Sequence, residues 1–210
     1  PVRVLHLVNA ALPDVVSGYT LRTARVLEAQ QRAGIQPTVV ALDLGHRAAG
    51  LDGVTWVDGV EHVHLTYPAR PRLRAPVADN LRAAALLAGA RLPGEAGRQV
   101  KLEVLVGWAA RQIAPVVDRV RPQLVHAHAP HWVAEVARRV SGRRPWVYEL
   151  RGLWGETAVA EGEDAAGSIR HRLSRRAEQR AARAADGCLP IAEALAAEGE
   201  GWGARVLGVA

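Results

Sequence analysis

Leu124 to Trp132 reads Leu-Val-His-Ala-His-Ala-Pro-His-Trp, so a short apolar run meets three histidines and a proline. The pattern predicts the carboxyl end of a buried strand. In an open parallel sheet that end faces the crevice where ligands bind, because strand ends, loops and helix amino-termini converge there. Histidine transfers protons and hydrogen-bonds to polar ligands near neutral pH, so this edge is a candidate site.

Apolar runs alternate with helical patterns on both sides of this stretch. We expect strands at residues 2–8, 37–42, 123–127, 145–150 and 188–191, shorter ones at 53–57 and 61–65, and a last one at 204–209. Helices are expected between Ser17 and Gly34, over residues 79–92, 98–120, 131–140 and 169–184, and from residue 192, with loops at 67–74 and 153–168. This alternation indicates an α/β fold with a doubly wound, mostly parallel, Rossmann-like sheet.

The composition describes a globular, arginine-rich chain. It has 210 residues, 49% of them hydrophobic, and a formal net charge of +6, and its single lysine is Lys101. A basic surface favours phosphorylated ligands, anionic lipid headgroups or nucleic acid as partners. Cys188 is the one cysteine, which excludes an internal disulfide, and no apolar run is long enough to span a bilayer. We therefore expect a cytoplasmic protein.

Two common nucleotide-binding motifs are absent. The first loop has no G-x-G-x-x-G, and the chain has no G-x-x-x-x-G-K-[ST], which argues against a dinucleotide site and a P-loop. Ser17-Gly18 instead opens the first helix, where free backbone N–H groups favour an anion and glycine lets it approach. An ordinary capped helix after a tight turn explains the same residues.

His126 and His128 are two residues apart, so on a strand their side chains point to the same face. A metal site would need further ligands from elsewhere, and the sequence shows no such spacing, so no metal is predicted. The alternatives are a hydrogen-bonded core histidine at position 126 and a loop-capping histidine at position 128. The strand end favours His128 as the functional one, and we expect His131 to start the next helix.

Charged residues follow the next strand. Arg151 is suited to bidentate contact with a phosphate, but Glu149 or Glu156 would equally make it a structural ion pair. In the helix at 169–184, the arginines at 170, 172, 175, 176, 180 and 183 mostly avoid an apolar stripe of Ile169, Leu173, Ala177 and Ala181. A solvated basic face explains them, and a membrane or nucleic-acid surface is the alternative.

Together these stretches resemble the amino-terminal half of retaining glycosyltransferases of family 4, which have the two-domain GT-B fold. The resemblance rests on the runs VRVLHLVN, SGYTLRTARVLEAQQRAG, RPQLVHAHAPH, WVYELRGLW and RAADGCLPIAEAL, in that order over nearly the whole chain. It implies that residues 1–210 form the acceptor-binding domain. The carboxyl-terminal nucleotide-sugar domain is not in these residues, so we expect a piece of a larger enzyme that is inactive alone.

The resemblance also implies roles for individual residues. His128 would face the transferred sugar as the catalytic residue, with His126 supporting it from within the strand. Gly18 would offer its backbone N–H to the donor diphosphate, and acceptor or phosphate contacts are expected from Ser17, Tyr19, Thr20, Arg22, Arg151 and Glu156. Two positions depart from the family pattern: Ser17-Gly18 replaces a common Gly-Gly pair, and Ala129 replaces a polar or acidic residue.

The expected reaction is transfer of a sugar from a nucleotide sugar to an acceptor hydroxyl with retention of configuration. No cofactor or metal is implied, since the nucleotide sugar is a co-substrate. The expected partners are this donor, a sugar or lipid-linked acceptor and the chain's own carboxyl-terminal domain, with peripheral contact to the inner face of the membrane for a lipid acceptor, and no nucleic acid. The alternative is a non-catalytic α/β module that binds a phosphorylated ligand or a partner protein.

Overall fold

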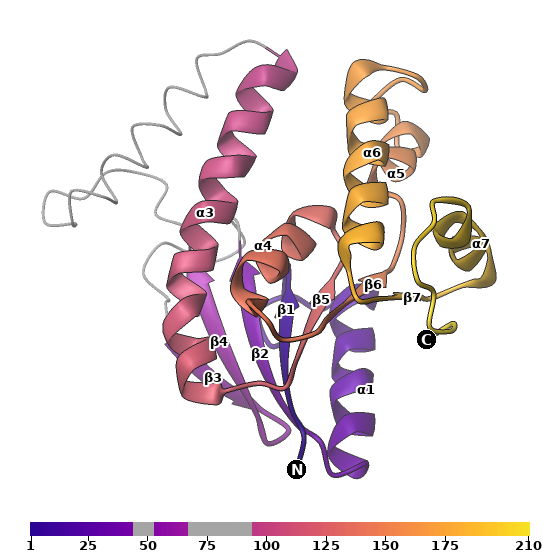
Figure 1. Cartoon of the computed structure of the whole chain (residues 1–210). Coiled ribbons are helices and arrows are strands. Elements are labelled where there is room, and N and C mark those ends of the chain that lie inside the picture. The colour runs from indigo at the N-terminus through magenta and orange to yellow at the C-terminus, as the bar shows by residue number, and fades with distance from the viewer. Residues whose placement is uncertain (44–52, 67–93) are drawn as a thin grey trace, which may run out of the picture.

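The computed structural model describes residues 1–43, 53–66 and 94–210, and the predictions for residues 67–74 and 79–92 lie outside them. The described part contains a seven-stranded sheet in the order β3-β4-β2-β1-β5-β6-β7, parallel except for β3, which pairs antiparallel with β4 (Figure 1). The strands are β1 Arg3–Val8, β2 Gln36–Asp43, β3 Gly53–Val57, β4 Val60–Thr66, β5 Leu124–His128, β6 Trp146–Leu150 and β7 Gly187–Pro190. The helices are α1 Gly18–Arg32, α3 Gly94–Val120, α4 His131–Ser141, α5 Trp154–Ala160, α6 Ile169–Ala184 and α7 Glu193–Gly201.

Helices cover both faces of this sheet. On one face, α3, α4 and α6 pack over a large apolar cluster that includes Leu5 and Leu7 of β1 and Val125 of β5. On the other face, Leu27 of α1 packs over a smaller cluster with Val8 of β1. Burial on both faces is why the central strands β1, β5 and β6 are rich in apolar residues. The doubly wound, mostly parallel α/β prediction is therefore confirmed.

Two local predictions were wrong. The segment 204–209 is no strand, because only Val206 forms an isolated bridge, to Cys188, between glycines with positive φ at 203 and 208. Residues 153–168, predicted as a loop, contain α5. In the first turn of α5, Thr157 N–H donates a hydrogen bond to the Leu153 carbonyl, and at Gly155 the helix packs closely against α6. The apolar stripe predicted on α6 is partly buried: Ala181 packs against the large apolar cluster, Ile169 is 63% exposed, and the fully buried residues are Glu178 and Ala182.

Ser17 caps α1, as predicted, and does so through a reciprocal capping box with Thr20. The Ser17 hydroxyl accepts a hydrogen bond from Thr20 N–H, and Thr20 Oγ1 accepts one from Ser17 N–H. The cap fixes where α1 begins, directly after the loop that follows β1.

Replacing Ser17 with alanine removes this cap. We expect Ser17→Ala to lower the free energy of unfolding by about 1 kcal/mol, since one helix N–H loses its partner. Urea unfolding followed by circular dichroism measures this, with Ser17→Asn as the matched variant that restores a capping side chain. A cap without energetic value would leave Ser17→Ala and Ser17→Asn equally stable.

Among the described residues, no helix combines the length and the apolar character needed to cross a bilayer.

Candidate functional site

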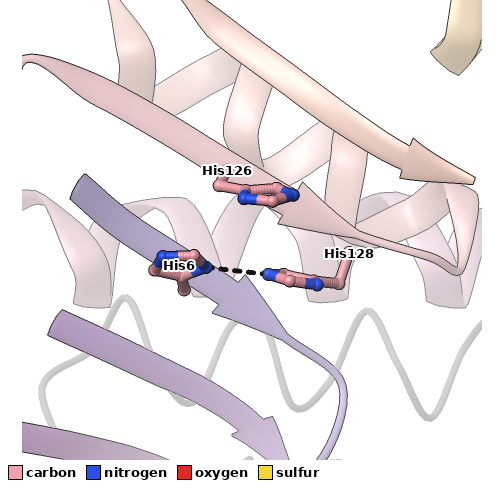
Figure 2. A group of neighbouring side chains, drawn as sticks. All are labelled: His6, His126 and His128. Carbon is pink, nitrogen blue, oxygen red and sulfur yellow. Dashed lines mark hydrogen bonds between the residues drawn. The ribbon is translucent and has the colours of Figure 1, made fainter. Parts of the chain in front are cut away.

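Three buried histidines lie together under the carboxyl ends of β1 and β5. In the β1–β5 ladder His6 stands opposite His126, and His128 follows two residues later on β5. Because side chains alternate along a strand, all three point to the face that α1 covers. Figure 2 shows the three rings gathered over the two strands. The His126 and His128 rings are stacked, with their centroids 4.2 Å apart.

Hydrogen bonds connect this histidine cluster, His6, His126 and His128, to α1. His6 Nδ1 lies 2.9 Å from His128 Nε2, and His6 Nε2 lies 2.8 Å from the Gln30 side-chain oxygen. Burial, followed by the charge of His126, lowers the pKa of His128 to about 3, and burial likewise holds the pKa of His6 well below its usual value. Both rings are therefore neutral at physiological pH.

Glu149, opposite His128 in the β5–β6 ladder, is the negative centre of the site. Its Oε2 lies 2.8 Å from His128 Nδ1 and 3.3 Å from His126 Nε2, and its Oε1 accepts a 2.7 Å hydrogen bond from Arg22 Nε. Burial alone would raise the pKa of Glu149, but its hydrogen bonds to the two histidines and the charge of Arg151 together hold that pKa far below its usual range. Glu149 is thus a buried carboxylate that binds several partners at once.

Arg151 connects the histidine cluster to the start of α1. Its NH2 group lies 2.6 Å from His128 Nδ1 and 3.3 Å from Glu149 Oε2, while NH1 donates to the Tyr19 carbonyl and the Thr23 hydroxyl. The guanidinium also lies over the Tyr19 ring at 4.3 Å, and only 7% of the Arg151 side chain is exposed. Most of its donors are therefore already engaged inside the protein.

A pocket of about 410 Å³ opens beside this network. Arg22 reaches it from α1 and is 30% exposed, and only its Nε has a hydrogen-bond partner among the described residues. A Cβ atom added at Gly18 would meet nothing within 4 Å, so the first turn of α1 is open to a ligand. The lining is Asn9, Ala10, Val15, Ser17, Gly18, Tyr19, Arg22, Ala129, Arg151, Gly152, Trp154, Thr157 and Ile191.

The structure brings five of the predicted contact residues to this strand-end pocket: Ser17, Gly18, Tyr19, Arg22 and Arg151. His126 and His128 lie behind it and are buried, so neither side chain lines it. His131 begins α4, as predicted.

Two predicted contact residues are engaged elsewhere. Thr20 is buried in the capping box and lines a different pocket, between α1 and the β3–β4 hairpin. Glu156 lies on α5, where it pairs with His171 at 3.0 Å and Arg175 at 2.9 Å, away from the strand-end pocket.

His6 and Gln30 were not predicted as site residues, and Glu149 was predicted only as a partner for Arg151. His6 sits inside an apolar run that reads as core, and nothing local connects it to residues 122 positions away. One signal was present, since a histidine on β1 shares the strand-end edge with the His-x-His stretch. Gln30 gave no signal beyond its place on the inner side of α1.

Comparison with known proteins gives a likeness of fold. No family model matches the chain, and no curated protein matches it by sequence. Among solved structures, sucrose-phosphate synthase from Thermosynechococcus elongatus superposes with a TM-score of 0.63 at 12% identity, over 98% of this chain and 47% of that one. A UDP-forming trehalose-phosphate synthase from Burkholderia vietnamiensis gives a TM-score of 0.49 at 14% identity, over 92% of this chain and 40% of that one. The chain spans about half or less of the length of these proteins, and its Rossmann-like α/β fold is similar to that of the part of sucrose-phosphate synthase that it covers.

Proposed function

We propose that this chain is the acceptor-side half of a glycosyltransferase of the family 4 type. Such an enzyme moves a sugar from a nucleotide sugar to an acceptor hydroxyl with retention of configuration, and it needs no further cofactor. The observation that carries the proposal is the fold-level match to one half of sucrose-phosphate synthase over 98% of the chain. The pocket at the carboxyl ends of the strands, where open α/β sheets bind ligands, supports it.

The geometry favours distinct tasks for the two pocket arginines. Arg22 donates a hydrogen bond to Glu149 through Nε alone, so its two terminal nitrogens are available for a bidentate contact with a phosphate. Arg151 has its NH1 and NH2 groups bonded inside the protein, so it positions the site rather than binding the ligand. The Gly18 N–H, in the open first turn of α1, adds a donor for the same anion.

His128 is proposed to act on the transferred sugar from behind this pocket. The ring is fully buried, and its Nδ1 faces both Glu149 and Arg151. Contact with a sugar therefore requires the imidazole to leave these partners. In retaining transfer of this type the leaving diphosphate helps to take the acceptor proton, so a paired acid and base within this half is not required.

The proposal sets the partners of the chain. A nucleotide sugar and a sugar or lipid-linked acceptor would meet in the cleft between this half and a carboxyl-terminal half. A nucleotide-sugar donor fits a cytoplasmic enzyme, and a lipid-linked acceptor would bring it to the inner face of the membrane.

The experiment that tests the function has two arms. In the first arm, calorimetry measures the binding of UDP, sugar phosphates and inorganic phosphate to the chain. In the second arm, the chain is joined to a donor-binding half, and the release of nucleoside diphosphate from nucleotide sugars measures sugar transfer by the joined protein. Retained configuration in the product, established by NMR, supports the proposal. Binding of a phosphorylated ligand with no transfer by the joined protein favours the non-catalytic binding module instead.

Arg22→Gln tests the phosphate contact. We expect the Kd for a phosphorylated ligand to rise about 10-fold to 100-fold, since a charge-assisted hydrogen bond contributes about 1.5–3 kcal/mol. Calorimetry on the purified chain gives the Kd, and thermal unfolding confirms that the variant is folded. Arg25→Gln is the matched control, because Arg25 lies on the same helix and contacts Glu28 on the surface. If Arg22→Gln and the unaltered chain bind the ligand with equal affinity, Arg22 does not contact the phosphate.

A further inference from the structure

A groove lies between α3 and α6, which stand on either side of α4 in Figure 1. It consists of two adjoining cavities of about 920 Å³ and 600 Å³, which share Gln99, Leu102, His131 and Trp132. The larger cavity also adjoins the strand-end pocket, because Trp154 and Thr157 of α5 line both. Its volume is within the range of about 300–1,000 Å³ that is typical of small-molecule sites. This α3–α6 groove is therefore large enough for a ligand that extends to the strand-end pocket.

The lining of the larger cavity fits an uncharged molecule with an apolar body. Its large apolar side chains are Leu102, Leu105, Trp132, Trp154 and Leu173. Its charged residues balance, with Arg98, Lys101 and Arg170 against Glu161, Glu163 and Asp164. The strand-end pocket differs, since Arg22 and Arg151 line it and none of its lining residues is acidic. A phosphate is therefore better placed in the strand-end pocket, and a neutral molecule in the α3–α6 groove.

His131 is a polar residue that lines both cavities of the groove. Its imidazole is 20% exposed, and its Nδ1 lies 3.2 Å from Oε1 of Glu178, a fully buried residue of α6. The same oxygen accepts the His131 backbone N–H, and Glu178 Oε2 accepts a 2.5 Å hydrogen bond from the Tyr148 hydroxyl. Burial, followed by the charge of Glu178, raises the pKa of Tyr148 well above its usual value, so the phenol keeps its hydrogen.

These contacts determine which nitrogen of His131 carries the hydrogen. Both oxygens of Glu178 accept hydrogen bonds, so His131 Nδ1 is the donor in its contact with Oε1. In the neutral imidazole Nε2 is then unprotonated and acts only as an acceptor. No group in the described part of the chain donates a hydrogen bond to this Nε2. A hydroxyl of a ligand in the groove would supply the missing donor.

We propose that the α3–α6 groove binds the sugar acceptor, an uncharged alcohol with an alkyl or aromatic body, and that His131 Nε2 accepts a hydrogen bond from one of its hydroxyls. This inference rests on the proposed function, since it names the acceptor class of that enzyme. Glu178 and Tyr148 are positioning residues, which hold the ring and its tautomer. An acceptor that extends past Trp154 reaches the strand-end pocket, where we place the donor phosphate.

A purely structural role explains only part of this arrangement. Pro130, the N-cap residue of α4, makes no side-chain hydrogen bond, and Glu178 caps the helix instead by accepting the His131 backbone N–H. Any residue with a backbone N–H at position 131 would make that contact. Helix capping therefore requires neither an imidazole that lines the groove nor a ring nitrogen that lacks a partner among the described residues.

Octyl β-D-glucoside, kept below its micelle concentration, is the probe that tests the groove. We expect calorimetry on the purified chain to show saturable binding of one molecule per chain. Methyl β-D-glucoside, which lacks the apolar body, is expected to bind at least about 10-fold more weakly, because it buries far fewer CH₂ groups. Nitrogen-15 NMR is expected to place the His131 ring hydrogen on Nδ1 and to show a shift of Nε2 when octyl glucoside is added.

Two variants test the residues that we assign to the acceptor. His131→Phe keeps a planar ring and the backbone N–H but removes Nε2, and we expect it to raise the Kd for octyl glucoside about 2-fold to 10-fold, the effect of one lost neutral hydrogen bond. Trp154→Ala changes an exposed side chain of the groove, is expected to raise the Kd about 10-fold, and decides the question if His131→Phe does not fold. His171→Gln is the matched control with an unchanged Kd, because the His171 ring also pairs with a glutamate but lines neither cavity.

The inference is overturned if octyl glucoside does not bind saturably, or if methyl glucoside binds equally well. It is also overturned if a folded His131→Phe, or Trp154→Ala in its place, binds octyl glucoside as tightly as the unaltered chain, which would leave Glu178 as a helix cap alone. These results are independent of the test of the proposed function. A joined protein that binds the glucoside but transfers no sugar contradicts the proposed function, whereas transfer without glucoside binding contradicts the assignment of the groove.

Discussion

His128→Ala is expected to lower the turnover of a glycosyltransferase that contains this chain by at least about 100-fold, the usual effect of deleting one preorganised donor at a reacting centre. His128 is the last residue of β5, and it contacts Arg151, the residue that both lines the strand-end pocket and reaches the histidine cluster. Alanine removes the only imidazole that we assign to the sugar. The sheet is expected to stay intact, because the larger apolar cluster packs on the opposite face, through Val125 and Ala127.

The measurement is the kcat with saturating nucleotide sugar, together with circular dichroism and thermal unfolding of each variant. His62→Ala is the control, since it deletes another buried imidazole on the same sheet, outside the histidine cluster. We expect kcat to change less than about 3-fold in His62→Ala, because the His62 ring makes no hydrogen bond within the described part of the chain. Near-normal turnover of a folded His128→Ala enzyme would refute the catalytic role of His128.

The sequence predicts this site well where a local rule applies. The two-residue period of a strand places His126 and His128 on one face, and the structure stacks their rings. Capping chemistry likewise identifies Ser17 as the start of α1. Both inferences need only residues that are close in the chain, and so they hold without knowledge of the fold.

Contacts across the sheet could not be predicted in the same way. His6 meets His128 because β1 pairs with β5 in a particular register, and the sequence holds no rule for that register. Arg22 bonds Glu149 for a similar reason, since the contact joins α1 to β6 across 127 residues. Glu156 lies only five residues beyond Arg151 in the sequence, but its carboxylate pairs with His171 and Arg175 of α6, a contact that likewise depends on the fold.

Glu149→Gln is expected to lower the free energy of unfolding by about 3–5 kcal/mol, the usual cost of breaking a buried ion pair from one side. Glu149 is 1% exposed and contacts Arg22, Arg151, His126 and His128. The neutral amide leaves the largely buried Arg151 without its counter-charge. Such a loss is a large fraction of the roughly 5–15 kcal/mol that typically stabilises a domain. Urea unfolding measures it, and Glu135→Gln, at a surface pair with Arg138, is expected to cost about 0–1 kcal/mol.

The pH dependence separates the lost charge from a packing defect. Because the pKa of Glu149 is lower in the folded than in the unfolded chain, the carboxylate stabilises the fold above the unfolded glutamate pKa of about 4.3 and progressively less as the pH falls below it. The difference in stability between the unaltered chain and Glu149→Gln should therefore be constant from neutral pH to about pH 5 and shrink at lower pH. Adding Arg151→Met to Glu149→Gln should recover part of the loss, since it removes the uncompensated guanidinium. If this difference in the free energy of unfolding does not change between about pH 6 and pH 3, the glutamine destabilises the fold through poor packing, and the buried ion pair is not what stabilises the site.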